Sequence, residues 1–468
     1  MENEKVQSQS LTAFPEGSVR ELWTISLPLM ISTLASLMMI FVDRLFLARY
    51  SLDALNASVN AGTWAWAYLG GVGMLTAMSE IFVSQFNGAK MHSRIGVPVW
   101  QMIWVAIFSS LFFIPMAIWM GPLLYSGTPY EATQVDYFRI LMLFGPCYAL
   151  MTALSGFFIG RGRTKILILL AVIANIINVV FDWILIFGIK GIIPEMGVKG
   201  AAFATCVGYI FEASVLMYLF LKKNNRDEFG TSQWRFESKT FSRCFKVGFP
   251  QAVFYTLEII GFAVFYQMMT SLSPLHITIS SICQSILILL SFFLDGLSRG
   301  VAAVAGNFIG AKRLDMLKHV LKSGLILQIF FSLFISLFFL FDPKASISLL
   351  FPGHFETHAE IWTRELGMPL FDVLRTCLIC AFLYISLEGV RWVLAGILTA
   401  AGDTLFLLFA GALSVWVFLL LPVYLIVVRH AFTVDYAWLL TVFYSALSCA
   451  IYWVRFKKGK WREIDLMK

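Results

Sequence analysis

The chain has 468 residues, of which 59% are hydrophobic and only 13% are charged, and its mean hydropathy is +0.79. A soluble domain carries about 25% charged residues, so this chain has too few polar side chains to cover a water-soluble globule. The formal net charge is +7, but the Lys and Arg residues lie in short clusters between apolar stretches. That distribution argues against a nucleic-acid-binding domain and indicates a membrane protein with many spans.

The apolar stretches are long enough to be membrane-spanning helices, which need about 20 mainly apolar residues. Strands of an outer-membrane barrel would be about 10 residues long with alternating polarity, which these stretches are not. The sequence therefore predicts an all-α integral membrane protein of about twelve transmembrane helices. They are expected at residues 22–48, 57–86, 97–120, 137–160, 165–188, 197–221, 244–270, 276–309, 320–341, 375–399, 404–428 and 434–455.

The loops between these stretches alternate in basic charge. Most Lys and Arg residues lie at the two termini and in every second loop. Because Lys and Arg are enriched in cytoplasmic loops, both termini are predicted to be cytoplasmic, in a multi-pass protein of a plasma membrane of the bacterial inner-membrane type. The opposite loops hold only Arg49, Lys190, Lys199, Lys344, Arg364 and Arg429.

The sequence indicates an internal repeat of two halves. The polar residues 222–243 are predicted to be a cytoplasmic linker between an N-terminal six-helix lobe, residues 1–221, and a C-terminal six-helix lobe, residues 244–468. Pro28 matches Pro250, and residues 85–90 (QFNGAK) match residues 307–312 (NFIGAK) at the same offset. Repeats with an even number of helices have the same topology, so a central site between the lobes is expected.

Ionisable residues inside a spanning helix are costly and are candidates for function. Asp295 and Arg299 are four residues apart, and Glu388 and Arg391 are three apart, so each pair lies on one helix face and is able to form an ion pair. For the first pair a structural role is favoured. The candidates in the apolar stretches are Asp43, Arg44, Glu80, Asp182, Glu212, Glu258, Asp295, Arg299, Glu388 and Arg391.

Asn175, Asn178 and Asp182 share one face of the predicted helix at residues 165–188. Amide and carboxylate oxygens suit Na⁺ or can hold a proton, and the alternative is a hydrogen-bonded cluster between helices. Glu258 has no basic neighbour in the sequence. An unpaired carboxylate at membrane depth is a candidate for proton exchange.

Taken in order, these motifs resemble the multidrug and toxic compound extrusion (MATE) transporters. The resemblance implies an ion-coupled antiporter that exports organic, often cationic and aromatic, compounds in exchange for Na⁺ or H⁺ by alternating access. The similar segments cover most of the chain. They are residues 28–43, 88–89 with 310–311, 160–164, 175–188, 197–205, 248–258 and 384–396.

The resemblance also implies site residues. Asp43, Glu258 and Glu388 are the coupling or substrate carboxylates that it predicts. The supporting ion ligands that it implies are Asn178, Asp182, Thr205 and Tyr384. The family's amino-lobe cation or proton site falls on Asp43, Asn178, Asp182 and Thr205. Its carboxy-lobe cation site falls on Glu258, Tyr384 and Glu388. Catalytic residues, a bound metal and an organic cofactor are not expected. The coupling ion that the resemblance implies is Na⁺ or H⁺.

Arg49 and three candidate substrate or ion-pair arginines, Arg44, Arg299 and Arg391, depart from the family pattern. They are candidates for neutralising the acids or for binding substrate. They favour the alternative function, a flippase for an anionic or lipid-linked precursor. A membrane-embedded enzyme is less favoured, because His276 and His319 have no evident catalytic partner. We expect a monomer whose partners are a small-molecule substrate and the lipid bilayer, with no nucleic acid.

Overall fold

The computed structural model describes residues 11–341 and 370–467. Within these ranges all named elements are helical, and the one β contact is an isolated bridge between Ile189 and Ile193. The helices of the first half are α1 (Val19–Tyr50), α2 (Leu52–Thr76), α3 (Ser79–Gly88), α4 (Gly96–Phe108), α5 (Ser110–Pro115), α6 (Gly121–Tyr125), α7 (Glu131–Leu143), α8 (Gly145–Ile159), α9 (Lys165–Phe187) and α10 (Val198–Phe220). Those that follow are α11 (Lys223–Phe229), α12 (Ser238–Leu272), α13 (Pro274–Gly310), α14 (Leu317–Phe341), α17 (Leu370–Ala400), α18 (Thr404–Leu413) and α19 (Val434–Lys458).

The predicted membrane spans are confirmed. Eleven helical segments are long and apolar enough to cross a bilayer, and α7 with α8, bent by 41° at their junction, forms a twelfth candidate. The bend falls just before Gly145 and Pro146, and proline lacks the amide that would continue the helix. Large apolar side chains are exposed along the spans, such as Leu111 at 78% and Leu123 at 75%, as expected for a surface that faces lipid.

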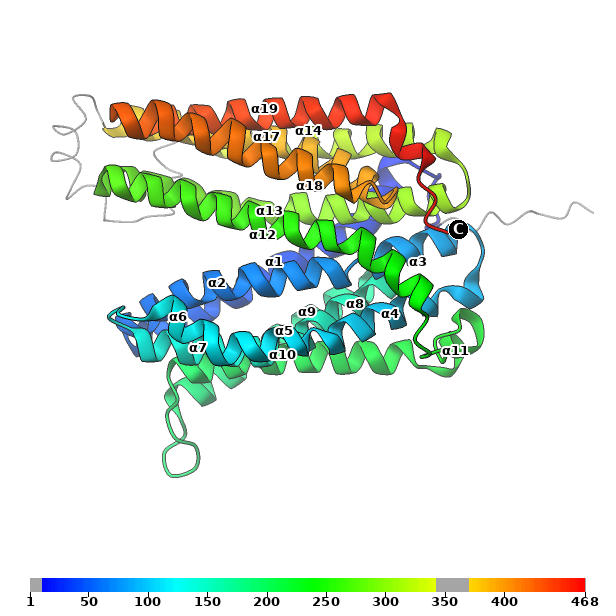
Figure 1. Cartoon of the computed structure of the whole chain (residues 1–468), viewed down its shortest axis with the longest axis horizontal. Coiled ribbons are helices and arrows are strands. Elements are labelled where there is room, and N and C mark those ends of the chain that lie inside the picture. Colours follow the sequence, from blue (N-terminus) through cyan, green and yellow to red (C-terminus); the bar gives the residue numbers. More distant parts are fainter. Residues whose placement is uncertain (1–10, 342–369, 468) are drawn as a thin grey trace, which may run out of the picture.

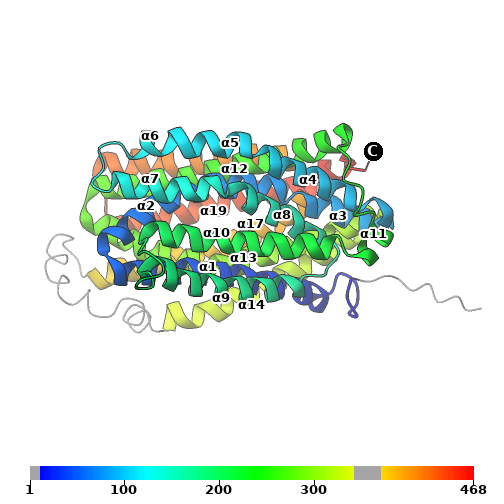
Figure 2. The same cartoon turned by 90° about the horizontal axis from the view of Figure 1, so that it is seen from below.

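Helices α1–α10, the amino half, lie on one side of the molecule, and helices α12–α19, the carboxy half, lie on the other (Figure 1). The long helices of both halves run along the same direction, which the turned view also shows (Figure 2). Helix α11 lies within the predicted linker at residues 222–243, and α12 begins inside it, at Ser238.

The repeated motif ends its helix in the same way in both halves. Lys90 and Lys312 have φ angles of 58° and 60°, a left-handed conformation that is uncommon for residues other than glycine. In each turn the next amide donates back to a phenylalanine carbonyl, at 2.9 Å for Phe86 and 2.8 Å for Phe308. This is a Schellman-type helix end, so the sequence similarity corresponds to one backbone turn used twice.

The two halves pack closely where these turns lie. A Cβ atom on Gly88 would overlap the backbone carbonyl of Asn307, and a Cβ on Gly310 would overlap the backbone carbonyl of Gln85. In the repeat, Gln85 corresponds to Asn307 and Gly88 to Gly310, so one contact is made in both directions. Only glycine allows such an approach of two helix backbones. This reciprocity is what two-fold-related halves produce.

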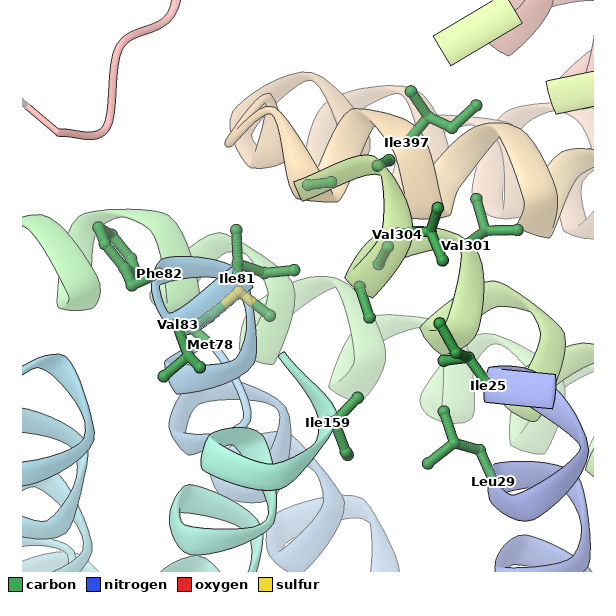
Figure 3. Close-up of a cluster of buried hydrophobic side chains, with 14 of the residues drawn as sticks. Ile25, Leu29, Met78, Ile81, Phe82, Val83, Ile159, Val301, Val304 and Ile397 are labelled. Carbon is green, nitrogen blue, oxygen red and sulfur yellow. The ribbon is translucent and has the colours of Figure 1, made fainter. Parts of the chain in front are cut away.

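The buried apolar side chains form one core that both halves share at the end carrying the C terminus. It joins Ile25, Phe82 and Ile159 of the amino half to Val304 and Ile397 of the carboxy half (Figure 3). Toward the other end each half has a core of its own, within residues 47–206 and within residues 265–444. The halves are therefore joined at one end, and toward the other end α1 and α2 diverge from α12 and α13 (Figure 1).

Candidate functional site

The amino half brings the predicted residues Asp43, Asn178, Asp182 and Thr205 together at the meeting of α1, α9 and α10. All four are buried, with relative exposures of 5%, 0%, 0% and 7%. The Thr205 hydroxyl donates to Oδ2 of Asp43 at 3.0 Å, and Asp182 and Asn178 lie within interaction range of the same carboxylate. These four residues are called the amino-half cluster below.

Most polar atoms of the amino-half cluster have no hydrogen-bond partner among the described residues. They are Oδ1 of Asp43, both carboxylate oxygens of Asp182, and both amide atoms of Asn178. None of the ion pairs formed within residues 11–341 and 370–467 involves Asp43 or Asp182. Burying a charged group away from water is costly unless it is paired. The geometry is that of a site which needs a proton or a cation.

The carboxy half arranges its acids differently, around one guanidinium. Nη2 of Arg391, on α17, lies 3.1 Å from Oε1 of Glu258, on α12. Its Nε donates to Oε2 of Glu388, one turn earlier on α17, at 2.8 Å, and its Nη2 also contacts that oxygen. The side chains of Arg391 and Glu388 are each 3% exposed, whereas that of Glu258 is 17% exposed. These three residues are called the carboxy-half cluster.

Neutral donors complete the environment of Glu388. The Ser445 hydroxyl of α19 donates to Oε1 at 2.9 Å, and the Trp392 indole donates to Oε2 at 3.2 Å. The Arg391 guanidinium lies 5.5 Å from the ring centroid of Tyr452. Both oxygens of Glu388 therefore have protein partners, and the buried guanidinium has two carboxylates and an aromatic face around it.

A third group of charges joins the halves. Nη2 of Arg299, on α13, lies 3.3 Å from Oε2 of Glu80, on α3. On the same helix as Arg299, Asp295 accepts a hydrogen bond of 2.9 Å from the Thr33 hydroxyl of α1. Each of these two contacts crosses from one half to the other, so each depends on how the halves are placed.

Two expectations about pairing are corrected. Asp295 and Arg299 form no ion pair within the described part of the chain, because Arg299 reaches Glu80 on the opposite half instead. Glu258 is not isolated, because the fold brings Arg391 to it from 133 residues along the chain. The expected pairing of Glu388 with Arg391 is present.

The remaining predicted residues take supporting or peripheral places. Tyr384 is buried beside Glu388, and its ring stacks on Tyr444 with centroids 6.5 Å apart. Asn175 donates to the carbonyl of Ala171 in its own helix at 2.8 Å. Arg44 is exposed and forms no ion pair with a described residue, although its charge acts on Asp43, its neighbour in α1.

Sequence reasoning missed several neighbours of these sites. Ser445 and Trp392 at Glu388 are polar or amphipathic residues within apolar stretches, and nothing in the local sequence distinguishes them from residues that face lipid. The sequence marks Glu80 as a charge inside an apolar stretch, but it does not indicate that Arg299 of the other half is its partner. Sequence spacing finds pairs on one helix face, and pairs between distant helices need the fold.

The sequence and fold were compared with those of known proteins. A sequence model of the MatE family matches residues 28–184 and 250–425. The multidrug resistance protein NorM of Photobacterium profundum is 27% identical over 320 residues, which are 67% of this chain and 70% of that protein. The probable multidrug resistance protein NorM of Pasteurella multocida is 28% identical over 415 residues, which are 85% of this chain and 84% of that protein.

Among solved structures, the outward-facing conformation of a multidrug resistance MATE family transporter superposes with a TM-score of 0.80 at 16% identity. The match covers 97% of each chain. At that identity the likeness concerns the fold alone. The family match spans both halves, from Pro28 in α1 to residue 425, just before the last helix. The chain therefore belongs to the MatE family, the multidrug and toxic compound extrusion transporters.

Proposed function

We propose that this transporter is an ion-coupled antiporter that exports organic, cationic and aromatic compounds by alternating access. It would work as a monomer in a bacterial-type inner membrane, with both termini in the cytoplasm. The observation that carries the proposal is the amino-half cluster, in which two buried carboxylates lie together without an ion pair to a described residue. Names of relatives such as the NorM proteins support the export of drugs.

The amino-half cluster is suited to a small cation. Two carboxylates, an amide oxygen and a hydroxyl oxygen are the hard ligands that Na⁺ accepts. A proton shared by Asp43 and Asp182 would also relieve the repulsion of two like charges that lie together in a medium of low dielectric. Either ion removes the cost of the unpartnered atoms, so the cluster supports coupling to Na⁺ or to H⁺.

The carboxy-half cluster is suited to recognising a cationic substrate. When all three side chains are ionised, two carboxylates and one guanidinium leave one negative charge. Glu258 is its most exposed member, at 17%, and only one of its oxygens faces Arg391. A cationic group that enters between the halves would meet that carboxylate, while Glu388 stays engaged with Arg391 and Ser445.

The packing of the halves supports a state that is closed at the predicted cytoplasmic end. There the Gln85 side chain donates to the carbonyl of Ala400 at 2.7 Å, and the Asn307 amide donates to the carbonyl of Gly160 at 2.9 Å. The shared core lies at the same end. Opening toward the cytoplasm must break these contacts together with the pair of Arg299 and Glu80.

The flippase alternative was favoured by intramembrane arginines as ligands for an anionic substrate. Two of the three are engaged with carboxylates, Arg299 with Glu80 and Arg391 with Glu258 and Glu388. Arg44 is exposed beside Asp43 in α1. The argument from the arginines for an anionic substrate is therefore weakened.

The experiment uses purified protein in sealed liposomes. A Na⁺ gradient and then a pH gradient are imposed while the movement of a fluorescent aromatic cation is followed. We expect movement under one gradient, which identifies the ion, and its loss in Asp43→Asn and in Glu258→Gln. Both variants should insert and purify as the wild type does. Normal gradient-driven movement by both would contradict the site assignment, and no movement by the wild type under either gradient would contradict the function.

A further inference from the structure

The outer surface of the carboxy half carries a groove between α14 and α19, at the end where the C terminus lies. Its volume is about 330 Å³, and it is lined by Lys318, Lys322, Leu325, Ile326, Ile329 and Trp453, among others. In Figure 1, α19 runs along the edge of the molecule that is farthest from the amino half. The groove therefore lies on the side of α14 and α19 that faces away from the amino half.

The basic end of this groove has unneutralised charge. Lys318 and Lys322 are exposed and form no ion pair within the described part of the chain. The ammonium group of Lys457 lies 5.4 Å from the ring centroid of Trp453, which brings a third cation to the same rim. By contrast, Arg455 on the other side of α19 is held by both oxygens of Asp403, at 2.7 and 2.9 Å.

The rest of the groove is apolar, and its length along α14 is close to the thickness of one hydrocarbon leaflet. Lys318 and Ile329 lie eleven residues apart on α14, which at 1.5 Å per residue is about 16 Å, close to half of a hydrocarbon core of about 30 Å. Ile326 and Ile329 are 43% and 57% exposed, so the protein leaves this face uncovered. A tryptophan at the basic end is typical of the depth of lipid head groups.

We propose that this groove binds an anionic phospholipid of the leaflet that contacts this end. The phosphate lies among the ammonium groups of Lys318, Lys322 and Lys457, beside the Trp453 indole. One acyl chain lies along Leu325, Ile326 and Ile329. A basic pocket between spanning helices with an apolar continuation is complementary to such a lipid in both charge and length. The inference does not depend on the ion or the substrate proposed above.

The test titrates lipid into the purified full-length protein in mild detergent and follows the thermal unfolding midpoint. The probes are phosphatidylglycerol, phosphatidylcholine with the same acyl chains, and glycerol phosphate as a soluble head group. The variant is Lys318→Gln with Lys322→Gln. The matched control is Lys239→Gln with Lys246→Gln, which removes two exposed charges from α12 at the same end, outside the groove.

We expect phosphatidylglycerol to raise the midpoint in a saturable way, with half-saturation weakened about tenfold or more in the groove variant and unchanged within about twofold in the control. Both variants should unfold at the wild-type midpoint without added lipid. Equal effects of phosphatidylcholine and phosphatidylglycerol would overturn the proposal. So would an equal effect of glycerol phosphate, which would indicate a site for soluble anions, or an unaltered response of the groove variant.

Discussion

The two halves of the transporter bury their carboxylates in different ways. In the amino half, Asp43 and Asp182 lie together without an ion pair to any described residue, and only a hydroxyl donates to them. In the carboxy half, Glu258 and Glu388 share the guanidinium of Arg391. The two halves share the backbone turn of the repeat, but within the described residues only the carboxy half pairs these buried carboxylates with a cation of its own.

We propose that this difference reflects two separate roles of the halves. Buried charge has to be compensated, and a cation fixed to the protein cannot leave during a transport cycle. Under the proposed function, the amino-half cluster is therefore the place where a mobile ion would change the energy of a conformational state. Such a difference in affinity between states is what drives exchange. In the same proposal, the carboxy-half cluster has a fixed net charge of one negative unit when its three side chains are ionised.

The largest expected effect is on the amino-half cluster. Asp182→Asn removes one of the two carboxylates, so ion-driven export should fall to background. Because Asp182 forms no ion pair with a described residue, the neutral amide removes uncompensated buried charge. The free energy of unfolding should therefore not fall by more than about 1 kcal/mol. Proteoliposome transport and denaturant unfolding measure the two effects. Export by Asp182→Asn at the wild-type rate would contradict a role of the amino-half cluster in ion coupling.

The next largest effect is expected for Arg391→Met, which makes the carboxy half resemble the amino half. Deleting one member of a buried ion pair leaves uncompensated charge and costs about 3–5 kcal/mol. Stability measured by unfolding in detergent should fall by that amount, and added Na⁺ should restore part of it. Arg391→Lys, which keeps the charge, serves as the control and should lose less. Unchanged stability of Arg391→Met would show that Arg391 does not neutralise the two glutamates.

A smaller loss of stability is expected where the two halves pack together, at the end that carries the C terminus. In Gly310→Ala the added methyl group overlaps the backbone at Gln85, and such overpacking costs about 1–3 kcal/mol. The expected result is lower stability of the closed state, measured by unfolding. Gly62→Ala is the matched control, because its methyl group would meet only a ring carbon of Tyr137 at 3.7 Å. Equal stability of the two variants would contradict the close packing of the halves.

The smallest effects come from the two hydroxyl donors. Thr205→Val and Ser445→Ala each remove one hydrogen bond to a buried carboxylate, and each should cost about 1 kcal/mol of stability. Only Thr205→Val should weaken ion binding, by about fivefold. Ion-dependent thermal stabilisation measures this, and equal weakening in both variants would argue against separate roles for the halves.

Much of the fold was open to prediction from sequence. Hydropathy marked the spans because a membrane helix must be apolar over its whole length. The match of residues 85–90 with 307–312 reflects the shared helix end at Lys90 and Lys312. A bent pair such as α7 and α8 still reads as one span, since hydropathy does not respond to a bend of 41°.

The site was predictable only in part. The pairing of Glu388 with Arg391 follows from their spacing on one helix, and the amino-half cluster was reached through family resemblance. The partner of Glu258 is Arg391, which lies on another helix. The expected pairing of Arg299 with Asp295 on its own helix was wrong, because Arg299 pairs with Glu80 of the other half. Contacts between helices depend on packing, which local sequence spacing does not encode.

The central claim is that the mobile ion belongs to the amino-half cluster. Its most direct test counts the ions bound per chain in purified protein, using ²²Na⁺ binding or proton uptake. We predict about one ion per chain in the wild type and in Glu258→Gln/Glu388→Gln/Arg391→Gln, which makes the carboxy-half cluster neutral, and none in Asp43→Asn/Asp182→Asn. Retained binding in the double variant with loss in the triple variant would contradict the account.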